Sequence, residues 1–164
     1  MNKFTDIKKD FPIFERDING KKLTYLDSGA TSQKPNSVIE KMNQIYKFNN
    51  ANVHRGTYAL SAETTHEYED VRNKCQSFLN ASESDEIIFT KGTTEALNFL
   101  ANSIANKFMT KGDEIILSEI EHHANIIPWQ MVAEKFGFNI NYVRINEDFS
   151  LDLDDLASKL SKKT

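Results

Sequence analysis

The sequence predicts an α/β domain with a largely parallel β-sheet. Three observations lead to this fold class: short β-branched or alternating apolar segments recur along the chain, amphipathic helical segments lie between them, and turn residues separate the two kinds. Strands that alternate with helices are typical of parallel sheets, because each helix carries the chain back to the start of the next strand. A chain of 164 residues, of which 39% are hydrophobic, is long enough to bury one such core.

The first half of the chain is expected to hold one strand and two helices. Residues 23–26 predict a short strand, which a glycine-containing turn at residues 27–30 ends. Pro35 favours the first turn of a helix, and we expect about twelve helical residues after it. A second helix is predicted over residues 62–79. Its apolar stripe, which should lie on a core, consists of Val71, Cys75, Phe78 and Leu79.

The second half of the chain repeats strand and helix three times. Strands are predicted at residues 86–90, 114–118 and 138–142. Helices are predicted from residue 96, at residues 128–136 and at residues 152–160. The last helix has acids in its first turn and Lys159 near its end, as the helix macrodipole prefers.

Charge and cysteine content exclude several classes of function. The 20 basic and 24 acidic residues are mixed along the chain, so no basic block follows a nucleic-acid backbone, and we expect no nucleic-acid partner. Cys75 is the only cysteine, which rules out an internal disulfide and a thiolate metal cage. No apolar run reaches membrane-spanning length, and the N-terminus lacks a signal-peptide pattern. We expect a cytoplasmic protein without membrane contact, or an organellar one if a transit peptide has been removed.

The strongest local signal is the segment Lys-Gly-Thr-Thr-Glu at residues 91–95. A glycine after a strand lets the backbone approach a ligand. The hydroxyls of Thr93 and Thr94, together with the free amides of a helix start, favour an anion such as phosphate. The alternative is a helix cap, with one of the two threonines as N-cap and no ligand.

Two adjacent histidines, His122 and His123, follow the strand predicted at residues 114–118, where open α/β sheets place their ligands. One of them can stack on a flat cofactor or transfer protons. Metal binding is disfavoured because adjacent side chains point apart and the HExxH spacing is absent. The alternative is a solvated loop in which one histidine hydrogen-bonds the backbone.

A further candidate is Arg55, which lies between His54 and Gly56 after a polar stretch. Its guanidinium suits bidentate binding of a carboxylate or phosphate, although an ordinary surface arginine is the alternative. Cys75 lies on a predicted apolar stripe, where a thiol packs as a small hydrophobe, so we do not assign it a nucleophilic role.

Five segments that occur in one order along the chain resemble the N-terminal part of the group II cysteine desulfurases. These belong to the aminotransferase class V family and share their pattern with the selenocysteine lyases. The five segments are residues 25–30 (YLDSGA), 33–35 (QKP), 53–56 (VHRG), 92–95 (GTTE) and 121–130 (EHHANIIPWQ). The last of them is the most specific.

The resemblance implies a fold-type-I pyridoxal-phosphate enzyme, normally a homodimer. Such an enzyme converts L-cysteine to L-alanine and passes the sulfur, as an enzyme persulfide, to an acceptor protein of iron-sulfur cluster assembly. Residues 1–20 would then form an N-terminal arm, and residues 21–164 would be part of the large cofactor-binding domain.

The resemblance also implies roles for individual residues. His122 resembles the histidine that stacks on the pyridine ring and assists proton transfer, and Thr93 and Thr94 resemble ligands of the cofactor phosphate. The positions that resemble the substrate-binding turn and the active-site entrance are Ser28, Gly29, Ala30, His54 and Arg55. Gly29 departs slightly from the pattern, because many relatives carry alanine there.

In this family, three further residues lie beyond the position of Thr164. They are the lysine that binds the cofactor covalently, the aspartate that faces the pyridine nitrogen, and the cysteine that accepts the sulfur. Cys75 does not match the last of these. We therefore expect these 164 residues alone to be inactive. The alternatives are a selenocysteine lyase, another class V aminotransferase, or a truncated product that acts as a non-catalytic dimerisation partner.

Overall fold

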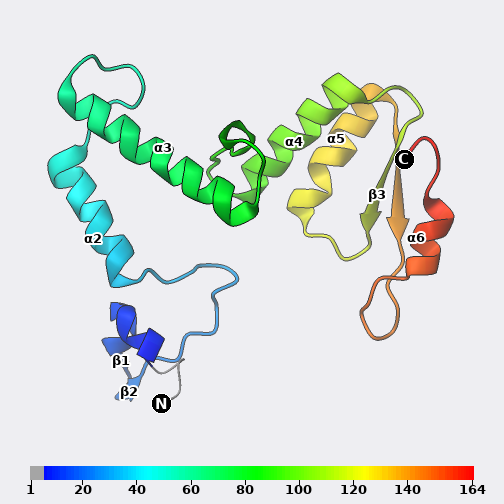
Figure 1. The fold of residues 1–164 in the computed structure, drawn as a ribbon. Coiled ribbons are helices and arrows are strands. Elements are labelled where there is room, and N and C mark those ends of the chain that lie inside the picture. Colours follow the sequence, from blue (N-terminus) through cyan, green and yellow to red (C-terminus); the bar gives the residue numbers. More distant parts are fainter. Residues whose placement is uncertain (1–5) are drawn as a thin grey trace. The chain divides into compact units, whose positions relative to one another are not determined.

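The computed structural model describes residues 6–164, which divide into two compact units. The first unit ends at Ile87, and the second comprises Ile88–Thr164. Figure 1 shows the helices and strands of both. No helix among the described residues is both long and apolar enough to cross a membrane.

The first unit begins with short turns and a small hairpin that the sequence patterns did not predict. Its elements are the 3-10 helices η1 (Lys8–Asp10) and η2 (Pro12–Glu15) and the antiparallel strands β1 (Asp17–Ile18) and β2 (Lys21–Lys22). Asn19 and Gly20 connect the two strands with φ angles of 53° and 74°. Asn-Gly is favoured here because both central positions of this hairpin turn need a positive φ.

The strand predicted over residues 23–26 is wrong. Only the amide of Leu23 continues the hairpin, by donating to the carbonyl of Arg16 at 3.1 Å. The side chain of Leu26 is 91% exposed. A strand needs a neighbour for its backbone groups, and no described strand lies beside this segment.

Two helices complete the first unit, as predicted. Helix α2 (Asn36–Gln44) follows Pro35 and continues into the π-helical turn η3 (Ile45–Asn49). Helix α3 (Ala59–Leu79) ends at Asn80, whose left-handed φ of 56° stops the helical run.

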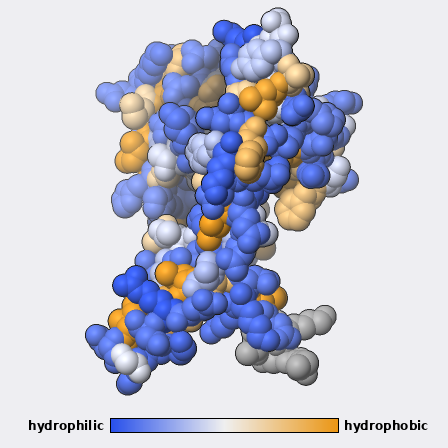
Figure 2. Space-filling view, turned by 90° about the vertical axis from the view of Figure 1, so that its left-hand side faces the viewer, coloured by the Kyte–Doolittle hydropathy of each residue, from blue (hydrophilic) through white to orange (hydrophobic). Residues whose placement is uncertain are grey.

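The apolar stripe predicted on α3 is not buried by the described residues. Phe78 is 88% exposed, and Val71 and Leu79 are also exposed, whereas Cys75 is partly buried. Apolar side chains of this kind appear in orange between hydrophilic ones on the surface in Figure 2. The expectation that the stripe lies on a core is therefore wrong for residues 6–164, since helical spacing selects a face but does not supply the layer that covers it.

The second unit contains three helices and two parallel strands. They are α4 (Thr93–Phe108), β3 (Glu114–Ser118), α5 (Ile127–Phe136), β4 (Asn139–Val143) and α6 (Leu153–Lys159), with the 3-10 turn η5 (His123–Asn125) before α5. Glu114 lies opposite Asn139, and Ser118 opposite Val143. This parallel pair, joined through α5, confirms the predicted α/β class.

The strand predicted at residues 86–90 does not form. The 3-10 turn η4 (Ser84–Glu86) takes up its start, and residues 87–90 belong to no strand. As at residues 23–26, an apolar β-branched segment is not a strand without a partner.

The core of the second unit lies where α4 and α5 pack against each other and α5 packs against β4. Ala101 and Ala105, one helical turn apart on α4, are fully buried. Because their side chains are single methyl groups, they allow the two helices a close approach. The remaining buried members of this core are Leu117, Trp129, Val132 and Phe138.

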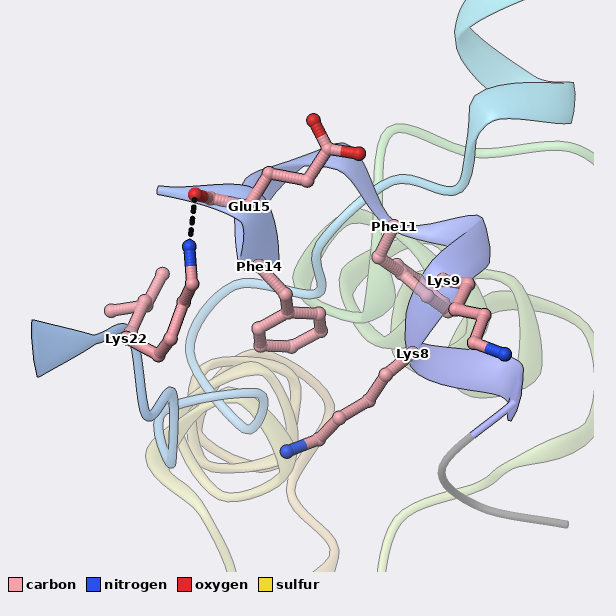
Figure 3. Close-up of a pocket in the computed structure, with 7 residues that line it drawn as sticks. Lys8, Lys9, Phe11, Phe14, Glu15 and Lys22 are labelled. Carbon is pink, nitrogen blue, oxygen red and sulfur yellow. Dashed lines mark hydrogen bonds between the residues drawn. The ribbon is translucent and has the colours of Figure 1, made fainter. Parts of the chain in front are cut away.

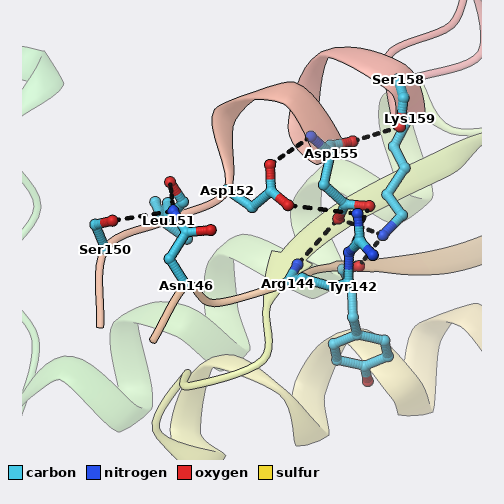
Figure 4. A network of polar contacts seen from close by, with 9 residues as sticks. All are labelled: Tyr142, Arg144, Asn146, Ser150, Leu151, Asp152, Asp155, Ser158 and Lys159. Atoms are coloured by element: carbon cyan, nitrogen blue, oxygen red, sulfur yellow. Dashed lines mark hydrogen bonds and ion pairs between the residues drawn. The ribbon is translucent and has the colours of Figure 1, made fainter. Parts of the chain in front are cut away.

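Helix α6 is bound to β4 by polar contacts around the buried carboxylate of Asp155 (Figure 4). Asp155 accepts from the ammonium of Lys159 at 2.5 Å and from the backbone amide of Arg144 at 3.0 Å. The Lys159 ammonium also donates to the carbonyl of Tyr142 at 2.5 Å, and Asp152 caps the helix by accepting from the Asp155 amide. The hydrogen bond from Lys159, followed by that from the Arg144 amide, holds the pKa of Asp155 below its ordinary value.

We predict that Asp155→Asn lowers the midpoint of thermal unfolding at neutral pH. The folded-state pKa of Asp155 is depressed, so its contribution to stability is present above the unfolded-state pKa and is lost as the pH falls through the folded-state value. The difference between wild type and variant should therefore shrink on acidification, as measured by unfolding curves of the intact protein from neutral to acid pH. Asp154→Asn, an exposed neighbour on the same helix, is the control, and an equal loss there would contradict the prediction.

Candidate active site

The turn before α4 presents unpaired hydrogen-bond donors. Gly92 precedes the helix with a φ of 151°, and a Cβ built on it would meet nothing within 4 Å. Among residues 6–164, the hydroxyls of Thr93 and Thr94 and the first amides of α4 find no hydrogen-bond partner. The turn itself is closed by Glu95, whose carboxylate accepts from the Lys91 amide at 2.6 Å.

This geometry contradicts the alternative of a simple cap by one of the threonines. The N-cap is Gly92, which has no side chain, and Thr93 and Thr94 lie inside the first helical turn with exposed side chains. The free amides carry the positive end of the macrodipole of a 16-residue helix. The start of α4 is thus open to an anion, as the sequence predicts for phosphate.

The loop after β3 is fixed by a chain of side-chain hydrogen bonds. Glu121 accepts from the hydroxyl of Ser118 at 2.8 Å and from the amide group of Asn125 at 2.9 Å. Asn125 in turn accepts from the indole N–H of the buried Trp129 at 3.0 Å. The bond from Asn125, and then that from Ser118, lowers the pKa of Glu121. The loop is thereby tied both to the end of β3 and to the core.

His122 sits exposed on this loop, beside His123. Its Nδ1 accepts from the backbone amide of Ala124 at 3.1 Å, so the proton of the neutral ring is assigned to Nε2. A solvated loop, the alternative to a functional histidine, also predicts a hydrogen bond between one histidine and the backbone. The bond from the Ala124 amide is that contact, and it orients the ring. Helix α4 packs against η5, which begins at the next residue. Within residues 6–164, no three histidine, cysteine or acidic side chains are grouped as metal ligands would be.

The loop that carries His54 and Arg55 lies on α3 in the first unit. His54 is left-handed, with a φ of 68°, at a backbone cost of about 1–2 kcal/mol. Its amide donates to the hydroxyl of Thr65 at 2.9 Å, and its ring stands edge-on to that of Tyr68 with centroids 5.6 Å apart. Arg55 is exposed and forms no hydrogen bond or ion pair with any residue from 6 to 164.

The turn at Ser28, Gly29 and Ala30 is also in the first unit and is exposed. The carbonyl of Asp27 accepts from the amides of Ala30 and Thr31 at 3.2 and 3.1 Å. The phenol of Tyr25 closes the turn by donating to the carbonyls at both of its ends, those of Asp27 and Thr31. The predicted substrate residues thus belong to the first unit, and Thr93, Thr94 and His122 to the second.

A pocket of about 320 Å³ opens near the start of the first unit (Figure 3). It contains none of the residues predicted for the active site. Its lining is Lys8, Lys9, Phe11, Phe14, Glu15, Lys22 and Leu23. The ammonium of Lys22 is already engaged, donating to the carbonyl of Glu15 at 3.1 Å and pairing with Asp17 at 3.2 Å. The candidate active site therefore consists of the segments described above and does not include this pocket.

The chain is similar in sequence to one protein family and to several known proteins. The model of the aminotransferase class-V family matches residues 24–164. A cysteine desulfurase of Pectobacterium atrosepticum is 46% identical over 158 residues, which are 96% of this chain and 39% of the relative. A probable cysteine desulfurase of Synechocystis sp. is 48% identical over 158 residues, 96% of this chain and 38% of the relative. The chain thus spans about two fifths of the length of these relatives.

A solved structure has a similar fold. The apo structure of a cysteine desulfurase from Thermococcus onnurineus NA1 matches with a TM-score of 0.86 at 36% identity. The match covers 97% of this chain and 38% of that one. This likeness over nearly the whole chain confirms the predicted fold type I.

We predict that Gly56→Ala weakens the attachment of the His54 loop to α3. A Cβ at Gly56 would lie 2.2 Å from Oγ and 2.4 Å from Cβ of Ser61, which is fully buried and donates to the carbonyl of Asn52. Overpacking of this kind costs about 1–3 kcal/mol, measurable by denaturant unfolding of the intact protein. Gly29→Ala, where a Cβ meets nothing within 4 Å, is the matched control. Equal stability of the two variants would refute the close contact.

Proposed function

The chain belongs to the aminotransferase class V family, and we propose that the protein it forms part of is a pyridoxal-phosphate-dependent cysteine desulfurase. Such an enzyme converts L-cysteine to L-alanine and retains the sulfur as an enzyme persulfide. The observation that carries the proposal is the cluster of unpaired donors at the start of α4, in a chain 46% identical to a cysteine desulfurase.

The start of α4 fits the phosphate of this cofactor. The amides of the first helical turn and the hydroxyls of Thr93 and Thr94 would hold its oxygens, and the open space at Gly92 lets an anion approach the backbone. When bound, pyridoxal phosphate supplies an electron sink for the bonds at the Cα of an amino acid.

His122 is proposed to lie flat against the cofactor ring and to transfer protons. The bond between its Nδ1 and the Ala124 amide leaves Nε2 as the atom that carries the mobile proton. The bond from the Ala124 amide orients the ring, and the contact between Glu121 and Asn125 fixes the loop that carries it; a proton transfer over hydrogen-bond distance requires such positioning.

The substrate carboxylate is proposed to bind at residues of the first unit. Arg55, which is exposed and has no partner among residues 6–164, is proposed to line the active-site entrance together with His54. Ser28, Gly29 and Ala30 are proposed to form the turn beside the substrate carboxylate.

We also propose the setting in which the whole protein works. It acts as a homodimer in the cytoplasm and passes its persulfide sulfur to an acceptor protein of iron-sulfur cluster assembly. The support is the resemblance of the five ordered segments to the group II enzymes, which work in this way, together with a chain of mixed charge and one cysteine.

We expect the intact protein, supplied with pyridoxal phosphate, L-cysteine and a thiol reductant, to release L-alanine and sulfide in equal amounts. Both products are quantified over the same time course. Formation of a keto acid in place of alanine would contradict desulfuration and favour a transaminase. A much faster reaction with L-selenocysteine than with L-cysteine would assign the protein to the selenocysteine lyases.

Replacing both Thr93 and Thr94 by alanine should weaken retention of the cofactor. A hydrogen bond to a charged group is worth about 1.5–3 kcal/mol, so loss of the two hydroxyls predicts at least a tenfold higher dissociation constant, on the order of 1.4 kcal/mol. Dialysis followed by absorbance of the bound cofactor measures this. The control is Ser103→Ala, which removes an exposed hydroxyl further along α4. Unchanged retention of the cofactor in the double variant would contradict the assignment of Thr93 and Thr94 as phosphate ligands.

A further inference from the structure

Three side chains spaced four residues apart join the loop between β3 and α5 to the core of the second unit. They are Glu121, Asn125 and Trp129. The side-chain oxygen Oδ1 of Asn125 accepts from the indole N–H of Trp129 at 3.0 Å, and Nδ2 of Asn125 donates to Oε2 of Glu121 at 2.9 Å. Asn125 is therefore the link between a buried aromatic side chain and the residue that precedes His122.

The two partners of Asn125 make opposite demands on the side chain between them. The indole of Trp129 can only donate a hydrogen bond, whereas an ionised Glu121 can only accept one. The bond from Asn125, followed by that from Ser118, holds the pKa of Glu121 below its ordinary value and so favours the ionised form. The connecting side chain must accept on one side and donate on the other. An amide does both, whereas the carboxylate of an aspartate, which has the same size, accepts only.

Asn125 also holds the backbone at His122. Its amide donates to the carbonyl of His122 at 2.7 Å, and the next amide toward the N-terminus, that of Ala124, donates to Nδ1 of the His122 ring. Glu121 is held from its other side by the hydroxyl of Ser118, at the end of β3. Because the His122 side chain is exposed, these bonds, and not burial in the core, set the position of its ring.

We propose that Asn125 is a positioning residue for the reaction. It transmits the fixed position of the buried Trp129 to the loop that carries His122, and so holds the imidazole where it transfers protons. The turn η5 packs against α4, the helix whose first turn is proposed to bind the cofactor phosphate, so the loop and the phosphate segment meet within one unit. Proton transfer is sensitive to such positioning because it requires hydrogen-bond distance. This role rests on the proposed desulfurase function.

The kinetic test uses the intact holoenzyme and compares wild type with Asn125→Ala and Asn125→Asp. In both variants the kcat for alanine release should fall at least about tenfold, with the KM for L-cysteine within about twofold, because a displaced proton-transfer group weakens the transition state and not substrate binding. Asn125→Asp keeps the side-chain size but sets a carboxylate against Glu121, so wild-type kcat in this variant would contradict the need for a donor. Asn139→Ala, at the opposite end of the β3–β4 pair from this loop, should match wild type.

Two variants of Glu121 separate the hydrogen bonds from the charge. In Glu121→Gln, the amide oxygen still accepts from Asn125 and the NH₂ group can donate to the hydroxyl of Ser118, so kcat should stay within about twofold of wild type. Glu121→Ala loses both bonds, and its kcat should fall as far as that of Asn125→Ala. An equal fall in both Glu121 variants would overturn positioning in favour of a role for the negative charge.

Hydrogen-deuterium exchange gives a readout that does not depend on turnover. In Asn125→Ala, exchange should rise in residues 121–125 and stay unchanged in β3 and in the interior of α4. A rise throughout the second unit would show a merely structural role for Asn125. Normal turnover by wild type, with wild-type kcat and exchange in Asn125→Ala, would refute the positioning role alone. A wild type that releases no alanine would refute the proposed function, and the positioning role with it.

Discussion

The second unit depends on one packing contact, that of α4 against α5. Ala101 and Ala105 on α4 are fully buried in the core that includes this contact, and their methyl side chains favour a close approach of the helices. The parallel pair of β3 and β4 is joined through α5, with Leu117 and Trp129 in the same core. The two segments proposed to bind the cofactor are attached to this core, one at the start of α4 and the other after the end of β3.

Rigidity at the candidate active site therefore comes from two different sources. Around His122, a chain of hydrogen bonds from Ser118 through Glu121 and Asn125 reaches the buried indole of Trp129, so a polar loop is fixed by an apolar core. Around His54, hydrogen bonds and close backbone contacts with α3 hold the loop. Such a loop depends on individual side chains, since each polar contact is directional.

Local patterns predicted the helices well and the strands only in part. Pro35 predicted α2, and the strand predicted at residues 114–118 has the bounds of β3. The segments 23–26 and 86–90 have strand-like composition but pair with no described strand, because pairing depends on another part of the chain. The sequence patterns missed β1 and β2, because strands of two residues are too short to show an alternating pattern. The available signal for this hairpin is the Asn19-Gly20 turn.

The sequence by itself determined the α/β class, the family resemblance and the residue types of the site, because these depend on local periodicity and on motifs such as residues 121–130. Only the tertiary structure decided how those residues are held. It made Gly92 the N-cap and so left Thr93 and Thr94 free, and it placed Glu69 against His54, fifteen residues earlier in the chain. A contact of this kind arises where a loop folds back on a helix, and no local pattern of polarity specifies which face of the helix it meets.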